Sequence, residues 1–146
     1  MPLRLQNRII TELFMLEQKK ILVVEDHPDS AEMVEKLLKA LGCPTVWVAT
    51  NGPDALEIAY ESIPDLILLD VVLPKMSGLE VARRLKADPH TSAIPILALT
   101  AKAMEGDRER CLEGGCDGYL SKPFLPQQLK AEIAKLLGLS FPCSPT

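Results

Sequence analysis

An α/β fold built on a parallel sheet is the class that this sequence predicts, and three observations predict it. Five short apolar runs alternate with five segments of helical periodicity along the 146 residues. The runs are apolar almost throughout, which is typical of strands covered on both faces. Regular alternation of strand and helix favours right-handed crossovers around one sheet. The length suits a single domain with a full core.

The predicted strands are the apolar runs themselves. They occupy residues 21–24, 46–49, 66–69, 94–99 and 118–120, and the last is the shortest.

The first two predicted helices carry clear boundary signals. Asp29 is expected to cap the first, with Glu32 three residues later, and Gly42 ends it. The second begins near Gly52. Their expected buried stripes are Met33, Val34, Leu37, Leu38 and Leu41 in the first, and Ala55, Leu56, Ala59 and Tyr60 in the second.

The other three helices differ in strength. Ser77 to Glu80 has the capping-box form for the third, which ends before Asp88. The fourth, about Met104 to Glu113, has a thin apolar stripe and contains Gly106, so we expect a weakly anchored, mobile element. The fifth starts near Pro126, ends at Gly138 and buries Leu129, Ile133, Leu136 and Leu137.

The flanks divide the chain into three parts. Residues 1–18 form an N-terminal extension with a helical pattern, residues 19–138 form the domain, and residues 139–146 form a short tail. The extension is interpreted either as an amphipathic helix for dimerisation or docking, or as a frayed extension or an over-long start before Gln18.

Composition excludes several classes of protein. The net charge of −4 and the absence of a basic run argue against a nucleic-acid surface, and no apolar stretch reaches the length of a membrane helix. Four cysteines without C-x-x-C spacing and no evident secretory signal indicate reduced packing cysteines in a cytoplasmic protein.

Polar side chains follow four of the five runs. Glu25 and Asp26 follow the first, Asp70 ends the third, Thr100 ends the fourth and Lys122 lies just past the fifth. Parallel strands end on one edge of a sheet, where α/β proteins bind ligands. We therefore expect three carboxylates, a hydroxyl and an ammonium to converge.

Three close carboxylates repel one another, and two kinds of positive charge relieve this. Lys122 supplies one charge. Mg²⁺ prefers oxygen ligands, and Glu25, Asp26, Asp70 and the backbone carbonyl of Val72 are its predicted ligands.

The same grouping predicts phosphoryl chemistry. A carboxylate such as Asp70 can attack phosphorus to form an acyl phosphate, with cations stabilising the transferred group. Lys122 and the Thr100 hydroxyl would each serve a phosphoryl oxygen, and the small Ala101 would leave room for the group to enter.

In combination, four segments carry a family resemblance: ILVVEDHP (residues 21–28), DLILLDVVLPKMSGLE (65–80), PILALTA (95–101) and GCDGYLSKPF (115–124). Over residues 19–138 the sequence resembles the receiver domain of two-component response regulators. The resemblance implies a doubly wound five-stranded parallel sheet, flavodoxin-like, in the strand order 2-1-3-4-5 with helices on both faces. It also implies Mg²⁺-dependent phosphorylation of an aspartate.

The resemblance also assigns roles to individual residues. Asp70 is the phosphoacceptor, Glu25 and Asp26 are the acidic metal pair, and Val72 gives its carbonyl. Lys122 contacts the phosphate before a cis bond to Pro123. Thr100 and Tyr119 are the switch pair, which would repack the fourth helix, fifth strand and fifth helix. The first acidic position is Glu25, where Asp is often found.

The implied partners are a histidine kinase or histidine phosphotransfer protein and a downstream protein target. No effector module follows Gly138, so we expect a stand-alone signalling switch, with a dimer as an option and no enzymatic role beyond its own phosphorylation and dephosphorylation.

Three other readings stay open. In the first, the chain is a receiver excised from a larger kinase or regulator. In the second, it is a pseudo-receiver that no longer takes phosphate. In the third, it is a phosphohydrolase that uses Asp70 transiently. Phosphohydrolases of the haloacid dehalogenase type need a second Asp where this chain has Val72.

Overall fold

A computed structural model describes residues 17–101 and 106–139 of the chain. Its ten elements alternate between strand and helix in the predicted order. They are β1 (Lys20–Val24), α2 (Pro28–Ala40), β2 (Thr45–Ala49), α3 (Gly52–Ser62), β3 (Leu66–Asp70), α4 (Gly78–Ala87), β4 (Ile96–Thr100), α5 (Asp107–Glu113), β5 (Gly118–Ser121) and α6 (Pro126–Leu137). The predicted extension over residues 1–18 falls outside the described residues up to position 16, and the tail falls outside them from position 140.

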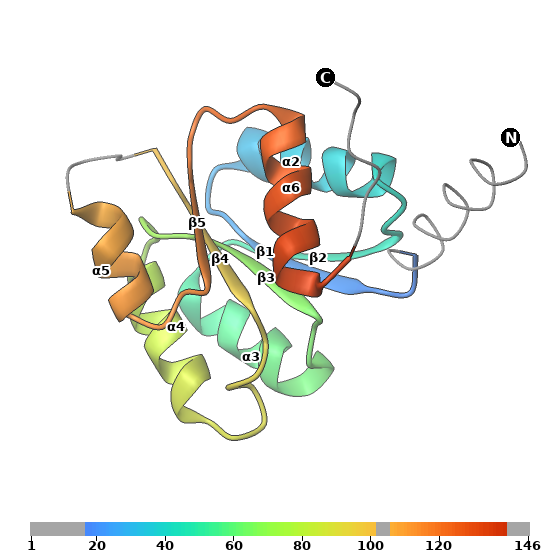
Figure 1. Cartoon of the computed structure of the whole chain (residues 1–146). Coiled ribbons are helices and arrows are strands. Elements are labelled where there is room, and N and C mark those ends of the chain that lie inside the picture. Colours follow the sequence, from blue (N-terminus) through green and yellow to red (C-terminus); the bar gives the residue numbers. More distant parts are fainter. Residues whose placement is uncertain (1–16, 102–105, 140–146) are drawn as a thin grey trace, which may run out of the picture.

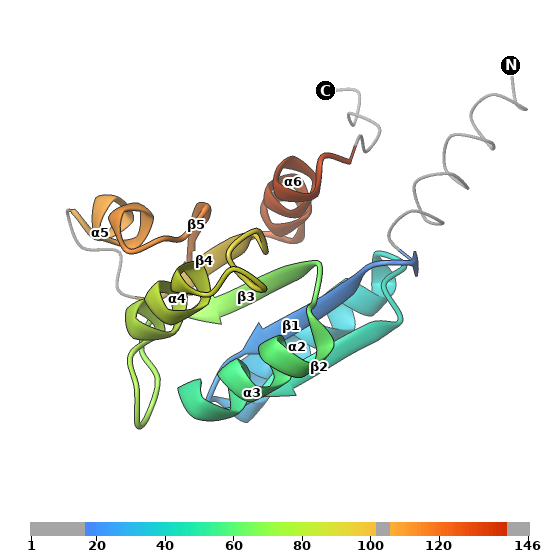
Figure 2. The ribbon, with the colours of Figure 1, turned by 90° about the horizontal axis from the view of Figure 1, so that it is seen from below.

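The sheet is parallel and has the order β2-β1-β3-β4-β5, as predicted. Helices α2 and α6 cover one face, and α3, α4 and α5 cover the other (Figures 1 and 2). Side chains of one strand alternate between the two layers: Ile21 and Val23 belong to the core under α2 and α6, and Leu22 belongs to the core under α3 and α4. The fold is therefore the doubly wound α/β class.

Full burial of the strands holds for the middle of the sheet and fails at its edge. The residues of β4 are all buried, as are the four apolar residues of β3. In β2, which has a strand on one side only, Val48 is exposed and Ala49 alone is buried. The prediction of strands covered on both faces was wrong for β2. This strand is the outermost of the sheet, so no further strand flanks it and some of its side chains reach solvent.

Two helix starts differ from those predicted. Helix α2 begins at Pro28 with His27 at the N-cap, so Asp29 lies in the first turn and does not cap. Proline suits the first helical position, since that position has no intrahelical hydrogen bond to donate. Gly106 is the N-cap of α5, with φ +90, and so lies before the helix that was predicted to contain it. Met104, the predicted first residue, lies outside the described residues.

Other boundaries and faces need smaller corrections. Ser77 caps α4 as predicted, its Oγ accepting from the Glu80 N–H at 3.2 Å. Ile94 and Pro95 precede β4, because the strand begins only at Ile96, which pairs with Ile67 of β3. Met33 and Tyr60, predicted to be buried, are 50% and 42% exposed, because each lies at the margin of its helix's apolar face.

The three described cysteines, Cys43, Cys111 and Cys116, are free and buried, which confirms their prediction as packing residues. Within the described ranges, no helix has both the length and the apolar character needed to cross a membrane.

Candidate functional site

The residues predicted to bind the metal and the phosphoryl group lie where the parallel strands end. Glu25 directly follows β1, and Asp70 and Thr100 are the last residues of β3 and β4. Lys122 follows β5, and its N–H donates to the Thr100 carbonyl at 2.8 Å. The parallel pairing therefore brings together side chains that are up to 97 positions apart in the sequence.

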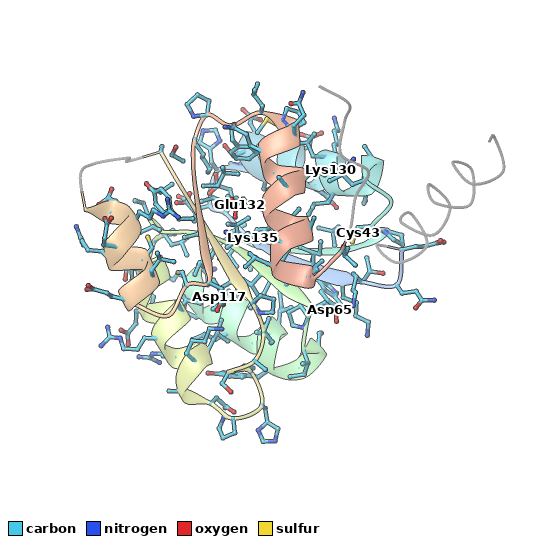
Figure 3. All side chains as sticks on the ribbon, viewed as in Figure 1. Cys43, Asp65, Asp117, Lys130, Glu132 and Lys135 are labelled. Carbon is cyan, nitrogen blue, oxygen red and sulfur yellow. The ribbon has the colours of Figure 1, made fainter. Side chains whose placement is uncertain are left out.

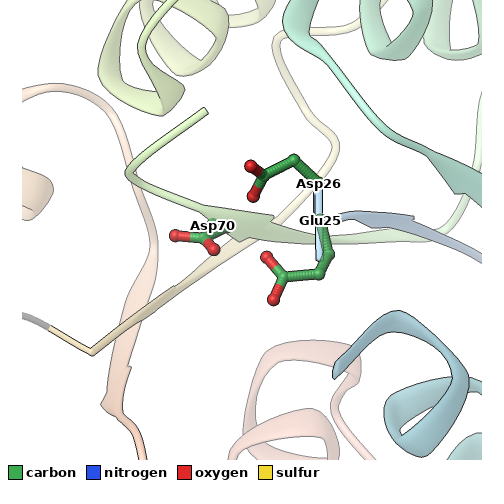
Figure 4. Close-up of side chains that lie close together, drawn as sticks. All are labelled: Glu25, Asp26 and Asp70. Atoms are coloured by element: carbon green, nitrogen blue, oxygen red, sulfur yellow. The ribbon is translucent and has the colours of Figure 1, made fainter. Parts of the chain in front are cut away.

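Three carboxylates converge at this edge (Figure 4). Glu25, Asp26 and Asp70 each offer an oxygen, and these oxygens lie within 4.8 Å of one another. Glu25 is buried, Asp70 is half-buried and Asp26 is exposed. The group therefore reaches from the protein interior to solvent, so that an ion or a phosphoryl donor can approach it.

Lys122 is the cation that the structure places against these acids. Its Nζ donates to Glu25 Oε1 at 2.8 Å and lies 3.5 Å from Asp70 Oδ2. Its side chain is largely buried, so the lysine charge is directed inward at the carboxylates. The Lys122–Pro123 peptide bond is cis, as predicted.

Charge at Glu25 is only partly compensated. Burial, followed by the interaction with Asp70, raises the pKa of Glu25 to about 7, although Lys122 acts in the opposite direction. Among the described residues, Glu25 Oε2 is buried and has no hydrogen-bond partner. A buried, unsatisfied carboxylate oxygen beside two further carboxylates is a donor set that fits a divalent cation such as Mg²⁺.

The backbone holds Asp70 in place in two ways. The Val72 N–H donates to Asp70 Oδ1 at 3.0 Å, and the Gly78 N–H donates to the Val71 carbonyl at 2.8 Å. A Cβ at Gly78 would lie 2.3 Å from the Asp70 carbonyl oxygen and 2.8 Å from Val71 Cα. The first residue of α4 therefore packs directly on the Asp70 backbone, and only glycine fits there.

Thr100 borders a cleft beside the acids. The cleft has a volume of about 300 Å³ and is lined by Val71, Val72, Leu79, Thr100, Asp107, Arg110 and Cys111. Thr100 itself is 2% exposed, whereas Ala101 is exposed. The cleft thus separates the loop after Asp70 from helix α5.

Tyr119 lies on β5 and is half-buried against the core layer that contains α5. Burial, and then the charges of Asp107 and neighbouring groups of α5, raise the pKa of its phenol. Its strand neighbour Ala98 is two residues before Thr100. The predicted switch residues therefore occupy adjoining strands next to α5.

Comparison with known families decides the identity. Residues 21–134 match the response regulator receiver domain. The chain belongs to this family. Polar-differentiation response regulators DivK from Brucella anthropi and Brucella abortus are each 42% identical to it over 120 residues, which is 82% of this chain and 97% of each relative.

Solved structures agree with this. A putative response regulator from Chloroflexus aurantiacus has a TM-score of 0.79 and 35% identity. The receiver domain of a sensor histidine kinase from Pseudomonas aeruginosa, whose crystal structure has a magnesium ion coordinated in its active-site cleft, has a TM-score of 0.77 and 37% identity. Each match covers 82% of this chain and 98% of the other.

One feature of this receiver domain was missed at the sequence level. The sequence pattern gives Gly78 only as part of a capping box, whereas the fold places it against the Asp70 backbone. Lys122 was predicted to offset the carboxylates as well as to contact a phosphate, and its shorter contact in this structure is to Glu25. A glycine directly after a predicted N-cap is the one signal that would have pointed to the close approach.

Proposed function

We propose that this receiver domain accepts a phosphoryl group on Asp70. An Asp70 carboxylate oxygen attacks phosphorus of a phosphohistidine in a histidine kinase or phosphotransfer protein. The P–N bond breaks, the imidazole keeps the electron pair, and an acyl phosphate forms on Asp70. The convergence of Glu25, Asp26, Asp70 and Lys122 at the strand ends carries this proposal.

Each neighbouring group has a part in the proposal. Glu25, Asp26 and Asp70, with the Val72 carbonyl, would hold Mg²⁺, which when bound supplies charge neutralisation for phosphoryl oxygens. Lys122 holds a positive charge at the Asp70 carboxylate, and its chain is fixed there by the hydrogen bond to the Thr100 carbonyl. The exposed Ala101 leaves the approach to Asp70 open.

The output is proposed to be a change of the surface formed by α5, β5 and α6, read by a partner protein in the cytoplasm. Thr100 would move toward the phosphoryl oxygens, and Tyr119 would turn inward. Such a switch is a population shift between two packings, biased by contacts made in only one of them. The protein is thus a signalling switch whose chemistry is confined to its own phosphorylation and dephosphorylation.

The test is incubation of the full chain with a small-molecule phosphodonor, with Mg²⁺ and with a chelator. Intact mass should show one added phosphoryl group with Mg²⁺ and none with the chelator. Tandem mass spectrometry after borohydride reduction should place it at Asp70. Continuous turnover of phosphomonoesters, or no incorporation at all, would contradict the proposal.

Thr100→Ala is expected to separate phosphorylation from its output. The variant should still incorporate phosphate, because Asp70 and the acids are unchanged, but the amide NMR shifts of β5 and α5 should no longer respond to phosphorylation. Thr100→Ser is the control, since it keeps the hydroxyl and should keep the response. An unchanged response in Thr100→Ala would disprove the relay.

Val72 is expected to make the acyl phosphate long-lived. Its side chain is 51% exposed beside Asp70 and cannot orient an attacking water. Val72→Asn should release phosphate about tenfold faster, the equivalent of one added hydrogen bond. Val72→Ala is the control, because it widens the access of water without adding a group that could orient it. This variant should change the rate of phosphate release much less. Equal rates for the three proteins in a phosphate-release time course would refute this.

A further inference from the structure

The two ends of α5 are held very differently. At its N-terminal end the cap is Gly106, with φ +90 and no side-chain cap hydrogen bond, and Cys111 is the one buried residue of the helix. The cleft described above lies along this half, between Arg110 and the side chains of Val72 and Leu79. The N-terminal half of α5 therefore has little packing to fix it.

The C-terminal end of α5 is closed by a complete Schellman motif. The Cys116 N–H donates to the Cys111 carbonyl at 3.0 Å, and the Gly115 N–H donates to the Leu112 carbonyl at 3.2 Å. Gly115 has φ +107, which the motif requires. Cys111 and Cys116 are 2% and 5% exposed and belong to the same core layer.

Lys86 of α4 joins this motif to the rest of the domain. Its Nζ donates to the carbonyls of Ser92 and Ile94 at 3.1 and 2.8 Å and to Asp117 Oδ2 at 2.8 Å. These contacts use all three hydrogens of the ammonium group. The stem of Lys86 also lies against Gly115, where a Cβ would be 2.9 Å from Lys86 Cγ.

Asp117 completes the anchor at the junction of α5 and β5 (Figure 3). Its Oδ2 accepts from the Ile96 N–H at 2.8 Å, and its own N–H donates to the Ile96 carbonyl at 2.8 Å. One lysine therefore connects α4, the segment before β4, the start of β4 and the end of α5. The contacts of Lys86 and Asp117 lie where β4 and β5 begin, whereas Asp70 lies at the other end of the strands.

From these contacts we infer that Lys86 is a positioning residue that fixes the C-terminal end of α5. Movement of α5 on phosphorylation is then confined to its N-terminal half, which pivots near Cys111 along the border of the cleft. This inference rests on the proposed function, because phosphorylation is what shifts α5 from one position to the other. It assigns a role to a group that does not touch the phosphorylation site.

Amide hydrogen exchange followed by NMR tests the anchor. Lys86→Met keeps the stem against Gly115 and removes the three donors, whereas Arg83→Met removes a charge from the exposed face of the same helix. Without phosphodonor, exchange at Cys116 and Asp117 should be about tenfold faster in Lys86→Met, the loss of roughly one hydrogen bond, and unchanged in Arg83→Met.

Phosphorylation tests the pivot. In the wild type and Arg83→Met, phosphorylation should change exchange at Arg110 and leave Cys116 unchanged. In Lys86→Met, the change should spread to Cys116, while phosphoryl incorporation stays within about twofold of wild type, as expected for a distant site. A merely structural role for Lys86 would speed exchange without this redistribution, and so would overturn the inference.

The remaining outcomes are also decisive. A Cys116 amide that responds to phosphorylation as strongly as Arg110 in the wild type refutes the pivot. If the wild type takes up no phosphate, the proposed function and the pivot both fail, and the exchange data without phosphodonor still decide whether Lys86 is an anchor. Should Lys86→Met not fold, Asp117→Asn replaces it, since the amide oxygen can still accept from Ile96 while the charge partner of Lys86 is lost.

Discussion

Asp70→Asn is expected to reduce phosphoryl incorporation from a small-molecule donor by at least about a hundredfold, since an amide oxygen is a far weaker nucleophile than a carboxylate. We expect neither neighbouring carboxylate to restore the wild-type level of incorporation. Glu25 is buried and its Oε1 is engaged by Lys122, and Asp26 is exposed on the loop that follows β1. Intact-protein mass spectrometry with saturating Mg²⁺ measures the effect.

Asp65→Asn is the matched control for this experiment. Asp65 lies just before the other end of β3, where its carboxylate accepts from the Lys20 N–H at 2.8 Å. The substitution changes the net charge by the same amount and leaves the carboxyl ends of the strands, where Asp70 lies, untouched, so incorporation should match the wild type. Phosphate on Asp70→Asn at the wild-type level would mean that another residue is the acceptor.

Gly78→Ala is expected to lower the free energy of unfolding by about 3 kcal/mol, the cost of forcing extra volume into tightly packed surroundings. The new Cβ would lie 2.3 Å from the Asp70 carbonyl oxygen, so either α4 or the Asp70 backbone must shift. Backbone cannot rotate away as a side chain can. Urea unfolding gives the energy, and the rate of phosphoryl incorporation should fall as well, because the shift moves the acceptor.

Gly106→Ala provides the comparison. Gly106 has φ +90, but no atom of the described residues lies within 4 Å of a Cβ built there. Its substitution should cost only about 1–2 kcal/mol, from backbone conformation alone. It should also leave incorporation unchanged. Equal losses of stability in the two variants would show that close contact at Gly78 is not the cause.

The sequence predicts which side chains converge at the strand ends, because their convergence depends on regular features. Once the apolar runs are recognised as parallel strands, the residues after them must share an edge, which places Glu25, Asp70 and Lys122 together. The errors arose where the local signal was ambiguous. Asp29 and Pro28 both signal a helix start, and the structure follows the proline. The sequence allows Gly106 either to cap a helix or to lie unfavourably inside one, and in the structure it is the N-cap of α5.

Features made by tertiary contact leave no local pattern. Lys86 and Asp117 are 31 positions apart, and each alone looks like an ordinary surface charge. The close approach of Gly78 to Asp70 depends on how the loop between them folds back, which apolar periodicity does not encode. Met33 and Tyr60 lie at the margins of their helices' apolar faces, where helical spacing alone does not decide whether a side chain is covered.

The place of β1 in the sheet has a consequence for how the chain folds. The strand pairs with β2 on one side and with β3 on the other, and its four apolar residues are at most 1% exposed in the finished domain. During synthesis from the N-terminus, β1 emerges before β2 and β3, and Leu66 of β3 is made 45 positions later than its partner Ile21. A ribosome-bound fragment ending before β3 would leave one edge of this apolar strand open, making it a natural binding target for chaperones.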